Sequence, residues 1–170
     1  CLALANILDG YQRTFLMNGY QPHLSNILNT SNIKLETLNS ESPFIADVDE
    51  LSTYIDKKDI VILDGYQYDE SYMAILNDIA AGLVVIDDLN KGKYFADIIL
   101  NHGPHAKNAK YKSLNKTKLL LGEQYTLLRP AFYKNAGKGK VRDQVKVITI
   151  CFGGADPKNF ASKYLEALNL

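Results

Sequence analysis

Carboxylates and a tyrosine stand at the positions in this chain where chemistry is most plausible. Asp64-Gly65-Tyr66 follows one strongly apolar run and Asp87-Asp88 follows another. Paired aspartates can hold a metal ion, act as an acid–base dyad, or orient loops through hydrogen bonds. A tyrosine there can close over a sugar, hydrogen-bond a reacting group, or pack a loop onto the domain. We expect a structural or substrate-positioning role for the aspartates.

A second candidate is the glycine loop Gly153-Gly154-Ala155-Asp156, between an apolar run and a helical pattern. Glycines at such a turn let the backbone approach a ligand, and the following helix offers free N–H groups and its positive end. A diphosphate is the natural ligand. In the alternative interpretation Asp156 caps the helix and Pro157 takes its first position. The loop is neither a P-loop nor a full GxGxxG motif.

The segment Asn101-His102-Gly103-Pro104-His105 also follows an apolar run. A zinc site would need a third ligand at a fitting spacing, and no cysteine is close in sequence. The histidines have no serine or cysteine partner for a nucleophilic triad. We therefore expect no metal and no cofactor, and keep Asn101 as a candidate substrate contact.

The elements that must position these residues alternate along the chain. Apolar blocks predict strands at 13–17, 33–38, 59–63, 83–86, 97–100 and 118–121. Helical patterns predict helices at 1–8, 23–28, 47–56 and 69–81, the last with Tyr72, Ile75, Leu76 and Ile79 on its inner face. This alternation is typical of a parallel sheet covered on both faces, the Rossmann-like α/β class. Such sheets bind ligands at the carboxyl ends of their strands.

The composition changes at residues 135–144, which are polar, glycine-containing and locally basic. This pattern predicts a linker. After it we expect a new strand at 145–152, the glycine loop, and a helix from 160 to 170. The prediction is a truncated N-terminal Rossmann-like domain at 1–134, a linker at 135–144, and the beginning of a second domain at 145–170.

Composition narrows the function classes. The 170 residues are 46% apolar and carry 19 basic and 19 acidic side chains. An ordinary apolar content argues against wholesale disorder. Since the net charge is zero, the chain has no overall positive potential that would attract a nucleic acid or an anionic membrane. No run approaches the roughly 20 apolar residues that span a bilayer. Two cysteines, Cys1 and Cys151, are too few for a disulfide framework, so we expect a cytoplasmic protein.

The two ends of the sequence fall inside helical patterns. Cys1 begins one with no capping residue and no strand before it, and Leu170 lies within another. We expect the chain to be a fragment at both ends.

Five segments, read together, resemble a known family. They are Cys1–Ala5, Ile62–Tyr66, Val85–Leu89, Leu120–Pro130 and Cys151–Pro157. In this order and spacing the whole chain resembles the UDP-sugar hydrolases of pseudaminic acid biosynthesis (the PseG family) and the related spore-coat polysaccharide proteins. The resemblance implies the two-domain glycosyltransferase-B architecture of the MurG transferases, with the first strand of the N-terminal domain missing here.

The resemblance also implies a reaction. It is the metal-independent hydrolysis of UDP-2,4-diacetamido-2,4,6-trideoxy-β-L-altropyranose to UDP and the free sugar, by attack of water at the anomeric carbon with inversion. The family's catalytic histidine lies in a Gly-x-Gly-His-x-x-Arg loop that would precede Cys1, so we expect the present chain alone to be inactive. Tyr66 matches the family's active-site tyrosine. Gly153, Gly154 and Asp156 match the loop that approaches the diphosphate.

The predicted site is completed by Asp87 and Asn101, which come from the strand ends. Two loops depart from the family pattern: Asp64-Gly65-Tyr66 stands where many relatives have Asp-His-Tyr, and Asn101-His102 where an Asn-Gln-Asn type loop is common. Both lie near the expected substrate, so the exact sugar stays open. A glycosyltransferase of the same architecture and a non-catalytic nucleotide-sugar-binding module are the alternatives. The expected partner is a UDP-sugar, with neither nucleic acid nor membrane, and the oligomeric state is not predicted.

Overall fold

The computed structural model describes residues 1–19, 22–38, 48–153 and 156–168. The chain divides into two compact units, Cys1–Lys134 and Asn135–Leu170. The boundary falls where the composition becomes polar and glycine-containing. That residues 145–170 begin a UDP-binding domain stays a prediction.

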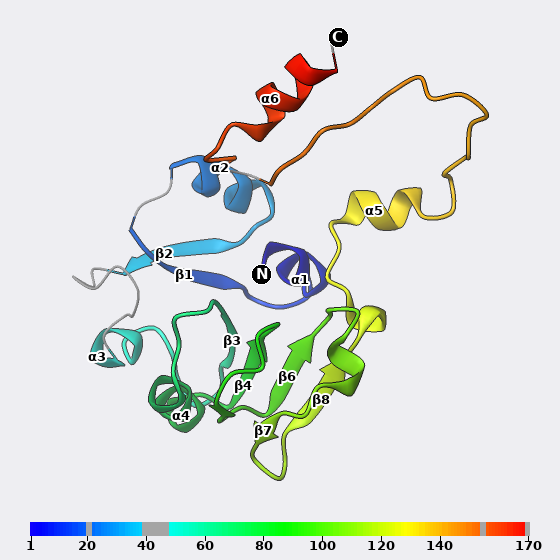
Figure 1. Cartoon of the computed structure of the whole chain (residues 1–170). Coiled ribbons are helices and arrows are strands. Elements are labelled where there is room, and N and C mark those ends of the chain that lie inside the picture. Colours follow the sequence, from blue (N-terminus) through cyan, green and yellow to red (C-terminus); the bar gives the residue numbers. More distant parts are fainter. Residues whose placement is uncertain (20–21, 39–47, 154–155, 169–170) are drawn as a thin grey trace. The chain divides into compact units, whose positions relative to one another are not determined.

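A four-stranded parallel sheet forms the centre of the first unit (Figure 1). Its order is β3 (Ile60–Asp64), β4 (Gly82–Ile86), β6 (Ile98–Asn101) and β8 (Lys118–Leu121). The central strands β4 and β6 bury most of their apolar side chains, and Leu83 and Ile99 are completely buried, whereas Ile60 at the start of β3 is 62% exposed. The predicted α/β class with a parallel sheet is confirmed. Since all four strands run the same way, their carboxyl ends meet at one edge.

A second, two-stranded parallel sheet contains β1 (Thr14–Asn18) and β2 (Lys34–Leu38). The helix α2 (Pro22–Thr30) connects them and buries Leu28 completely. Leu16 of β1 packs against the cluster that contains Leu63 of β3, so the two sheets share a core. Among the described residues, no strand pairs with the free edge of β1 or of β3.

Three further helices cover the unit: α1 (Leu2–Ile7), α3 (Val48–Leu51) and α4 (Glu70–Ile79). The α4 helix begins at Asp69, whose Oδ1 accepts hydrogen bonds from the Tyr72 N–H at 2.9 Å and the Ser71 hydroxyl at 2.7 Å. It buries Tyr72, Met73 and Leu76.

Two expectations about these helices are wrong. Ile75, expected on the inner face of α4, is 36% exposed, because the buried stripe is centred nearer to Met73. The α3 helix has four residues instead of the ten expected at 47–56, and residue 47 lies outside the described residues.

Arg13 ties α1 to the end of α2. Its guanidinium donates to the carbonyl oxygens of Ala5 at 2.9 Å and Ser31 at 3.1 Å. Carbonyls at helix C-terminal ends have no partner within their helix and carry the negative end of the dipole. A cation between two such ends therefore fixes the two helices against each other.

Short elements that the sequence did not predict connect the later strands. They are a parallel ladder of β5 (Lys93–Tyr94) with β7 (Lys112–Ser113), and the 3₁₀ turns η1 (Ala106–Asn108) and η2 (Glu123–Tyr125). Two-residue strands have no periodicity to detect. Their importance is that they place Tyr94 and Tyr111 beside the sheet edge.

The second unit contains α6 (Phe160–Ala167), and α5 (Pro130–Asn135) lies across the boundary. The strand predicted at 145–152 is wrong: the segment has no regular structure, and Val145 and Val147 are 84% and 75% exposed. A strand needs a neighbour for its backbone hydrogen bonds, and no described segment pairs with this one.

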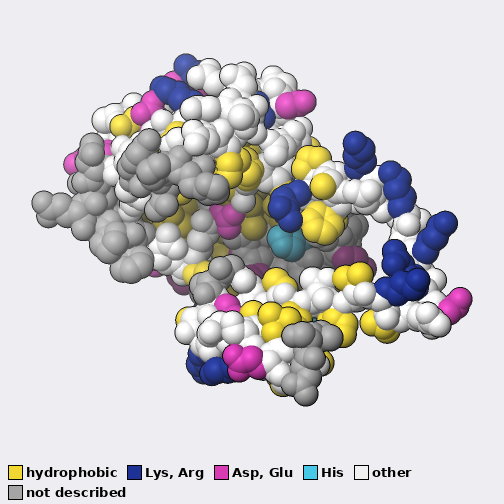
Figure 2. All heavy atoms as spheres, turned by 90° about the horizontal axis from the view of Figure 1, so that it is seen from above, with side chains coloured by type: hydrophobic (Ala, Val, Ile, Leu, Met, Phe, Trp, Pro, Cys, Tyr) yellow, Lys and Arg dark blue, Asp and Glu magenta, His cyan; other side chains and the backbone are white. Residues whose placement is uncertain are grey.

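The segment before it is exposed and basic. In Figure 2 lysine and arginine side chains follow the extended course of the chain at the right. Nowhere in the described ranges is there a helix with the length and hydrophobicity that crossing a membrane requires.

Candidate functional site

The carboxyl ends of β3 and β4 bring Tyr66 and Asp88 together. The ladder pairs Asp64 with Ile86, and two residues further along each chain the Tyr66 hydroxyl donates to Asp88 Oδ2 at 3.0 Å. The Tyr66 side chain is 71% exposed, at the edge where parallel sheets bind ligands. The structure therefore places Tyr66 where the sequence expected it, and its catalytic role stays a prediction.

Charge around Tyr66 keeps its hydroxyl protonated. The hydrogen bond to Asp88 and the negative charge of that carboxylate raise the pKa of Tyr66, and Asp64 and Asp87 add to the effect. Because the hydroxyl hydrogen is directed to Asp88, the tyrosine oxygen can accept a hydrogen bond from a ligand. Tyr66 in this state can bind and orient a group but cannot remove a proton from water at neutral pH.

Asp87 has a different environment, although it is the next residue. Its Oδ1 accepts from the Tyr94 hydroxyl at 2.9 Å. Its Oδ2 accepts from the Tyr111 hydroxyl at 2.6 Å and from the Asn90 N–H at 2.8 Å. These bonds join the end of β4 to the loops around β5 and β7. A substrate contact by Asp87, as predicted, would have to compete with three donors already in place.

Tyr94 and Tyr111, which donate to Asp87, keep their hydroxyl protons. Burial is the main cause that raises the pKa of Tyr94 and of Tyr111, and the hydrogen bond of each hydroxyl to Asp87 adds to it. Both therefore stay protonated throughout the physiological range. In the described part of the chain, no group of three or more His, Cys, Asp or Glu side chains is arranged to hold a metal ion.

Asn101 belongs to the same network. Its Nδ2 donates to the Tyr111 hydroxyl oxygen at 2.8 Å, and its Oδ1 accepts from the Gly103 N–H at 2.9 Å. The residue is only 5% exposed. The structure therefore places Asn101 beneath the sheet edge, and direct substrate binding by this side chain stays a prediction. His102 and His105, which follow it, are both exposed.

A cavity of about 60 Å³ is lined by Tyr66 together with Leu63, Tyr68, Met73 and Asp87, among others. About 10–15 Å³ of such space accommodates one water molecule, so this cavity suits small groups and not a whole sugar. A ligand as large as a sugar would have to lie outside the cavity, over the carboxyl edge of the sheet and against Tyr66.

A larger hollow of about 470 Å³ lies at the other end of the first unit, at the amino ends of β1 and β2. Arg13 and Lys34 are among the residues that line it. The Arg13 guanidinium is bound to backbone carbonyls and Lys34 forms an ion pair with Glu36. Both cations of this hollow, Arg13 and Lys34, therefore already have partners within the protein. The hollow also lies away from the carboxyl edge of the sheet.

Side chains of the following residues lie close to Gly65. A Cβ atom at this position would come within 2.7 Å of Tyr68 Cε2 and of Gln67 Oε1. Tyr68 itself stacks on Tyr72 of α4, with ring centroids 5.0 Å apart. A larger residue at 65 would have to displace the side chains of Gln67 and Tyr68.

The glycine loop of the second unit is partly described. Gly153 has a φ of 80°, a conformation that favours glycine, whereas Gly154 and Ala155 lie outside the described residues. Asp156 caps α6: its Oδ1 accepts from the Phe160 N–H at 2.9 Å and its Oδ2 from the Ala161 N–H at 2.8 Å. The N–H groups predicted to meet a diphosphate are thus partly occupied by the chain's own carboxylate.

Pro157 does not take the first helical position, because α6 begins only at Phe160. The contact of Gly153, Gly154 and Asp156 with a diphosphate stays a prediction.

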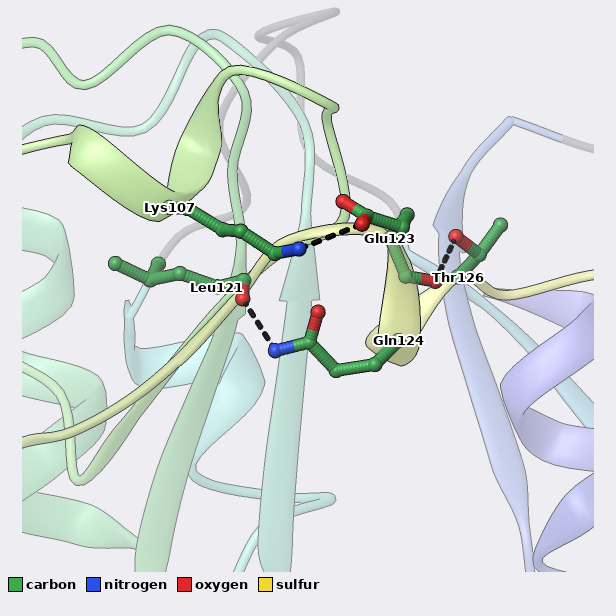
Figure 3. Close-up of polar contacts among 5 residues, drawn as sticks. All are labelled: Lys107, Leu121, Glu123, Gln124 and Thr126. Carbon is green, nitrogen blue, oxygen red and sulfur yellow. Dashed lines mark hydrogen bonds and ion pairs between the residues drawn. The ribbon is translucent and has the colours of Figure 1, made fainter.

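The turn after β8 lies in the middle of the resemblance segment Leu120–Pro130 (Figure 3). Lys107 of η1 forms an ion pair with Glu123 of η2 at 2.6 Å. The Gln124 side chain donates to the Leu121 carbonyl at 2.9 Å, and the Thr126 hydroxyl donates to the Glu123 carbonyl at 2.6 Å. These contacts close the turn on itself, which indicates a structural role for this part of the motif.

Sequence reasoning missed Tyr94 and Tyr111, which organise the edge. They lie 7 and 24 residues after Asp87 along the chain, and nothing in local spacing connects them with it. Asp88 was one of the strand-end candidates of the sequence, and the register of β3 and β4 places it opposite Tyr66.

No family model matches the chain. Among curated proteins, it is similar to the uncharacterized protein MJ1062 of Methanocaldococcus jannaschii, with 35% identity over 122 residues. The match covers 66% of this chain and 25% of that protein. The chain thus spans about a quarter of the length of the relative that it matches.

Proposed function

We propose that this chain forms part of a UDP-sugar hydrolase of glycosyltransferase-B architecture, like the hydrolases of pseudaminic acid biosynthesis. The observation that carries the proposal is the exposed Tyr66, held by Asp88 at the carboxyl edge of the sheet. The first residue of the chain lies beside this edge, since the terminal amino group of Cys1 is paired with Asp64 Oδ2 at 2.8 Å, and Asp64 is two residues before Tyr66. A histidine loop directly before Cys1, as the resemblance implies, would arrive beside that tyrosine.

The order of the strands supports the proposed architecture. Rossmann-type sheets have the strand order 3-2-1-4-5-6, in which the first strand lies between the second and the fourth. Here β2 and β1 form one sheet, and β3, β4, β6 and β8 form the other. One parallel strand between β1 and β3, leading into α1, would complete that order.

The proposed reaction is a single displacement. The oxygen of a water molecule attacks the anomeric carbon of UDP-2,4-diacetamido-2,4,6-trideoxy-β-L-altropyranose, and the bond from that carbon to the diphosphate oxygen breaks. UDP leaves with the electron pair, and the proton of the water passes to the histidine of the loop before Cys1. Attack on the face opposite the leaving group inverts the configuration.

Residues of this chain bind and orient the substrate. Tyr66 accepts a hydrogen bond from an amide N–H or a hydroxyl of the sugar, because its own hydrogen is directed to Asp88. The loop at Gly153 lets the backbone approach the diphosphate. UDP is already a good leaving group, so the proposal needs neither a metal nor a cofactor.

The proposal is tested by turnover. The polypeptide that includes the segment before Cys1 and the present chain are each incubated with the UDP-sugar, and UDP release is followed by ³¹P NMR. We expect the longer polypeptide to release UDP and the free sugar without any acceptor, and the present chain to release none. Turnover only after an acceptor is added would favour a transferase. Binding of the UDP-sugar without turnover by either polypeptide would favour a binding module.

A further inference from the structure

The two adjacent aspartates after β4 have separate partners. Asp87 accepts hydrogen bonds from the Tyr94 and Tyr111 hydroxyls and from the backbone N–H of Asn90. Asp88 is exposed, and its Oδ2 accepts from Tyr66, which follows the neighbouring strand. The Asp87 carboxylate therefore holds the loops on the domain. The Asp88 carboxylate instead binds Tyr66, the exposed tyrosine at the carboxyl edge of the sheet.

Tyr66 needs such a partner, because little else holds it. Its side chain is 71% exposed, so packing restricts its rotation weakly. A hydrogen bond to a carboxylate is among the stronger ones in proteins. The register of β3 and β4 fixes both Cα positions, since Tyr66 and Asp88 each lie two residues beyond the paired Asp64 and Ile86. The bond therefore determines the direction of the phenol.

The bond also determines what the phenol can do. When Asp88 accepts the hydroxyl hydrogen, the remaining lone pair of the tyrosine oxygen is directed away from Asp88 and is free to accept. The negative charge that takes the hydrogen polarises the hydroxyl, which makes its oxygen a better acceptor. Without Asp88 the same hydroxyl would rotate and donate to solvent or to the ligand.

We propose that Asp88 is the positioning residue for Tyr66, which it orients as a hydrogen-bond acceptor toward the substrate; this inference rests on the proposed function. Asp88 does not touch the reacting atoms. It acts only through the Tyr66 hydroxyl, so its effect should vanish when that hydroxyl is removed.

A double-mutant cycle tests this dependence. The variants Asp88→Ala, Tyr66→Phe, the combination of both, and Asp88→Asn are made in the polypeptide that includes the segment before Cys1. A lost hydrogen bond to a charged group corresponds to about a tenfold to hundredfold effect. We expect Asp88→Ala to lower kcat by about tenfold or more with a smaller change in KM, and to have no further effect in the Tyr66→Phe background.

Two controls separate positioning from folding. Asp88→Asn retains an oxygen that accepts from Tyr66, so most of the activity should be recovered. Asp78→Ala removes an exposed aspartate of α4 and should leave kcat and KM unchanged. Additive effects of Asp88→Ala and Tyr66→Phe, or full activity of Asp88→Ala, would overturn the proposal.

A second measurement does not depend on turnover. The 170-residue chain and its Asp88→Ala variant are each labelled with ¹³Cζ-tyrosine. The Tyr66 signal of each is then followed as the pH is raised. Asp64, Asp87 and Lys91 also border the small cavity or act on Tyr66, and they stay unchanged in both samples. We expect Asp88→Ala to lower the pKa of Tyr66, because the hydrogen bond and the charge that raise it are lost.

An unchanged Tyr66 titration would overturn the inference about Asp88, whether or not the enzyme turns over. Failure of the unsubstituted polypeptide to release UDP, together with a shifted titration, would contradict the hydrolase function and support the pairing. The two claims can therefore fail separately.

Discussion

At the scale of single residues, the edge of the main sheet is built from tyrosine hydroxyls that donate to aspartates. Tyr94 and Tyr111 use this bond to fix loops on Asp87, and Tyr66 uses it to hold an exposed phenol on Asp88. The chemical group is the same, but burial differs: Tyr94 is 4% exposed and Tyr66 is 71% exposed. Burial thus distinguishes the structural pairs from the one that can meet a ligand.

The first prediction concerns Tyr111. Tyr111→Phe removes the donor to Asp87 Oδ2 and the acceptor of the Asn101 amide, which leaves the buried amide nitrogen without this partner. We expect the free energy of unfolding to fall by about 1–3 kcal/mol, the cost of leaving a buried polar group unpaired. Urea unfolding followed by circular dichroism measures it.

Tyr11→Phe is the matched control, since Tyr11 is 73% exposed. It should change the urea midpoint little. Equal midpoints for the two variants would show that the Tyr111 bonds do not stabilise the domain.

Part of this residue-level picture was predictable. Placing Tyr66 and Asp87 at the edge required only that each follow an apolar run. The partners of Asp87 depended on the β5–β7 ladder, whose two-residue strands leave no pattern in the sequence. The Asn101 side chain is bound by Tyr111, and the sequence could not place Tyr111. The burial of Asn101 could therefore not be predicted either.

At the scale of elements, turns decide how the strand ends are presented. Gly122, which precedes η2, has a φ of 104° and a ψ of 178°, a region that only glycine adopts readily. A Cβ there would come within 2.7 Å of Lys107 Cγ and 2.8 Å of Gln124 Oε1. Backbone and side chains therefore both require glycine where the chain leaves β8.

Gly122→Ala should consequently destabilise the first unit. We expect the free energy of unfolding to fall by about 1–3 kcal/mol, the usual cost of a strained backbone position. Gly10→Ala is the control, because a Cβ at Gly10 meets nothing within 4 Å and no positive φ is found there. Thermal unfolding of both variants measures the difference, and an equal change in both would contradict the explanation.

Asp97 connects elements at the amino end of the sheet and gives a prediction about pH. Its carboxylate forms an ion pair with Lys116 at 2.8 Å and accepts from the Leu83 N–H at 3.0 Å. The Lys116 bond, and next the Leu83 bond, lower the pKa of Asp97. A lowered pKa in the folded state stabilises the protein above the unfolded value of about 3.9, and this contribution is lost as the pH falls through the folded value.

Asp97→Asn should therefore lower the urea midpoint at pH 7, and the difference from the unsubstituted chain should shrink toward pH 3. Asp78→Asn, on an exposed part of α4, is the control and should change neither midpoint. A difference for Asp97→Asn that is the same at both pH values would contradict a role for its charge.

The elements themselves were largely predictable where the sequence has short, strongly apolar runs. The four strands of the main sheet and α4 were expected within one or two residues of their observed ends. The strand at 145–152 was predicted from the same kind of run, but a run forms a strand only when a neighbour accepts its hydrogen bonds. In the described structure Val145 and Val147 have none and are exposed.

At the scale of the whole molecule, the chain consists of a well-packed unit, Cys1–Lys134, and a smaller unit, Asn135–Leu170. The first contains both hydrophobic clusters and the Tyr66 edge. The second contains Phe152, which packs on Phe160 and Tyr164 with centroids 5.5 and 5.3 Å apart, and the helix that Asp156 caps.

If the chain is part of a UDP-sugar hydrolase, water, and no other acceptor, attacks the anomeric carbon of a UDP-sugar held beside Tyr66. Hydrolysis by the polypeptide that includes the segment before Cys1, carried out in H₂¹⁸O and followed by mass spectrometry and ¹H NMR, tests it directly. We expect ¹⁸O at the anomeric position of the free sugar, initial release of the inverted anomer, and unlabelled UDP. Incorporation of ¹⁸O into UDP, or release of a sugar with retained configuration, would contradict it.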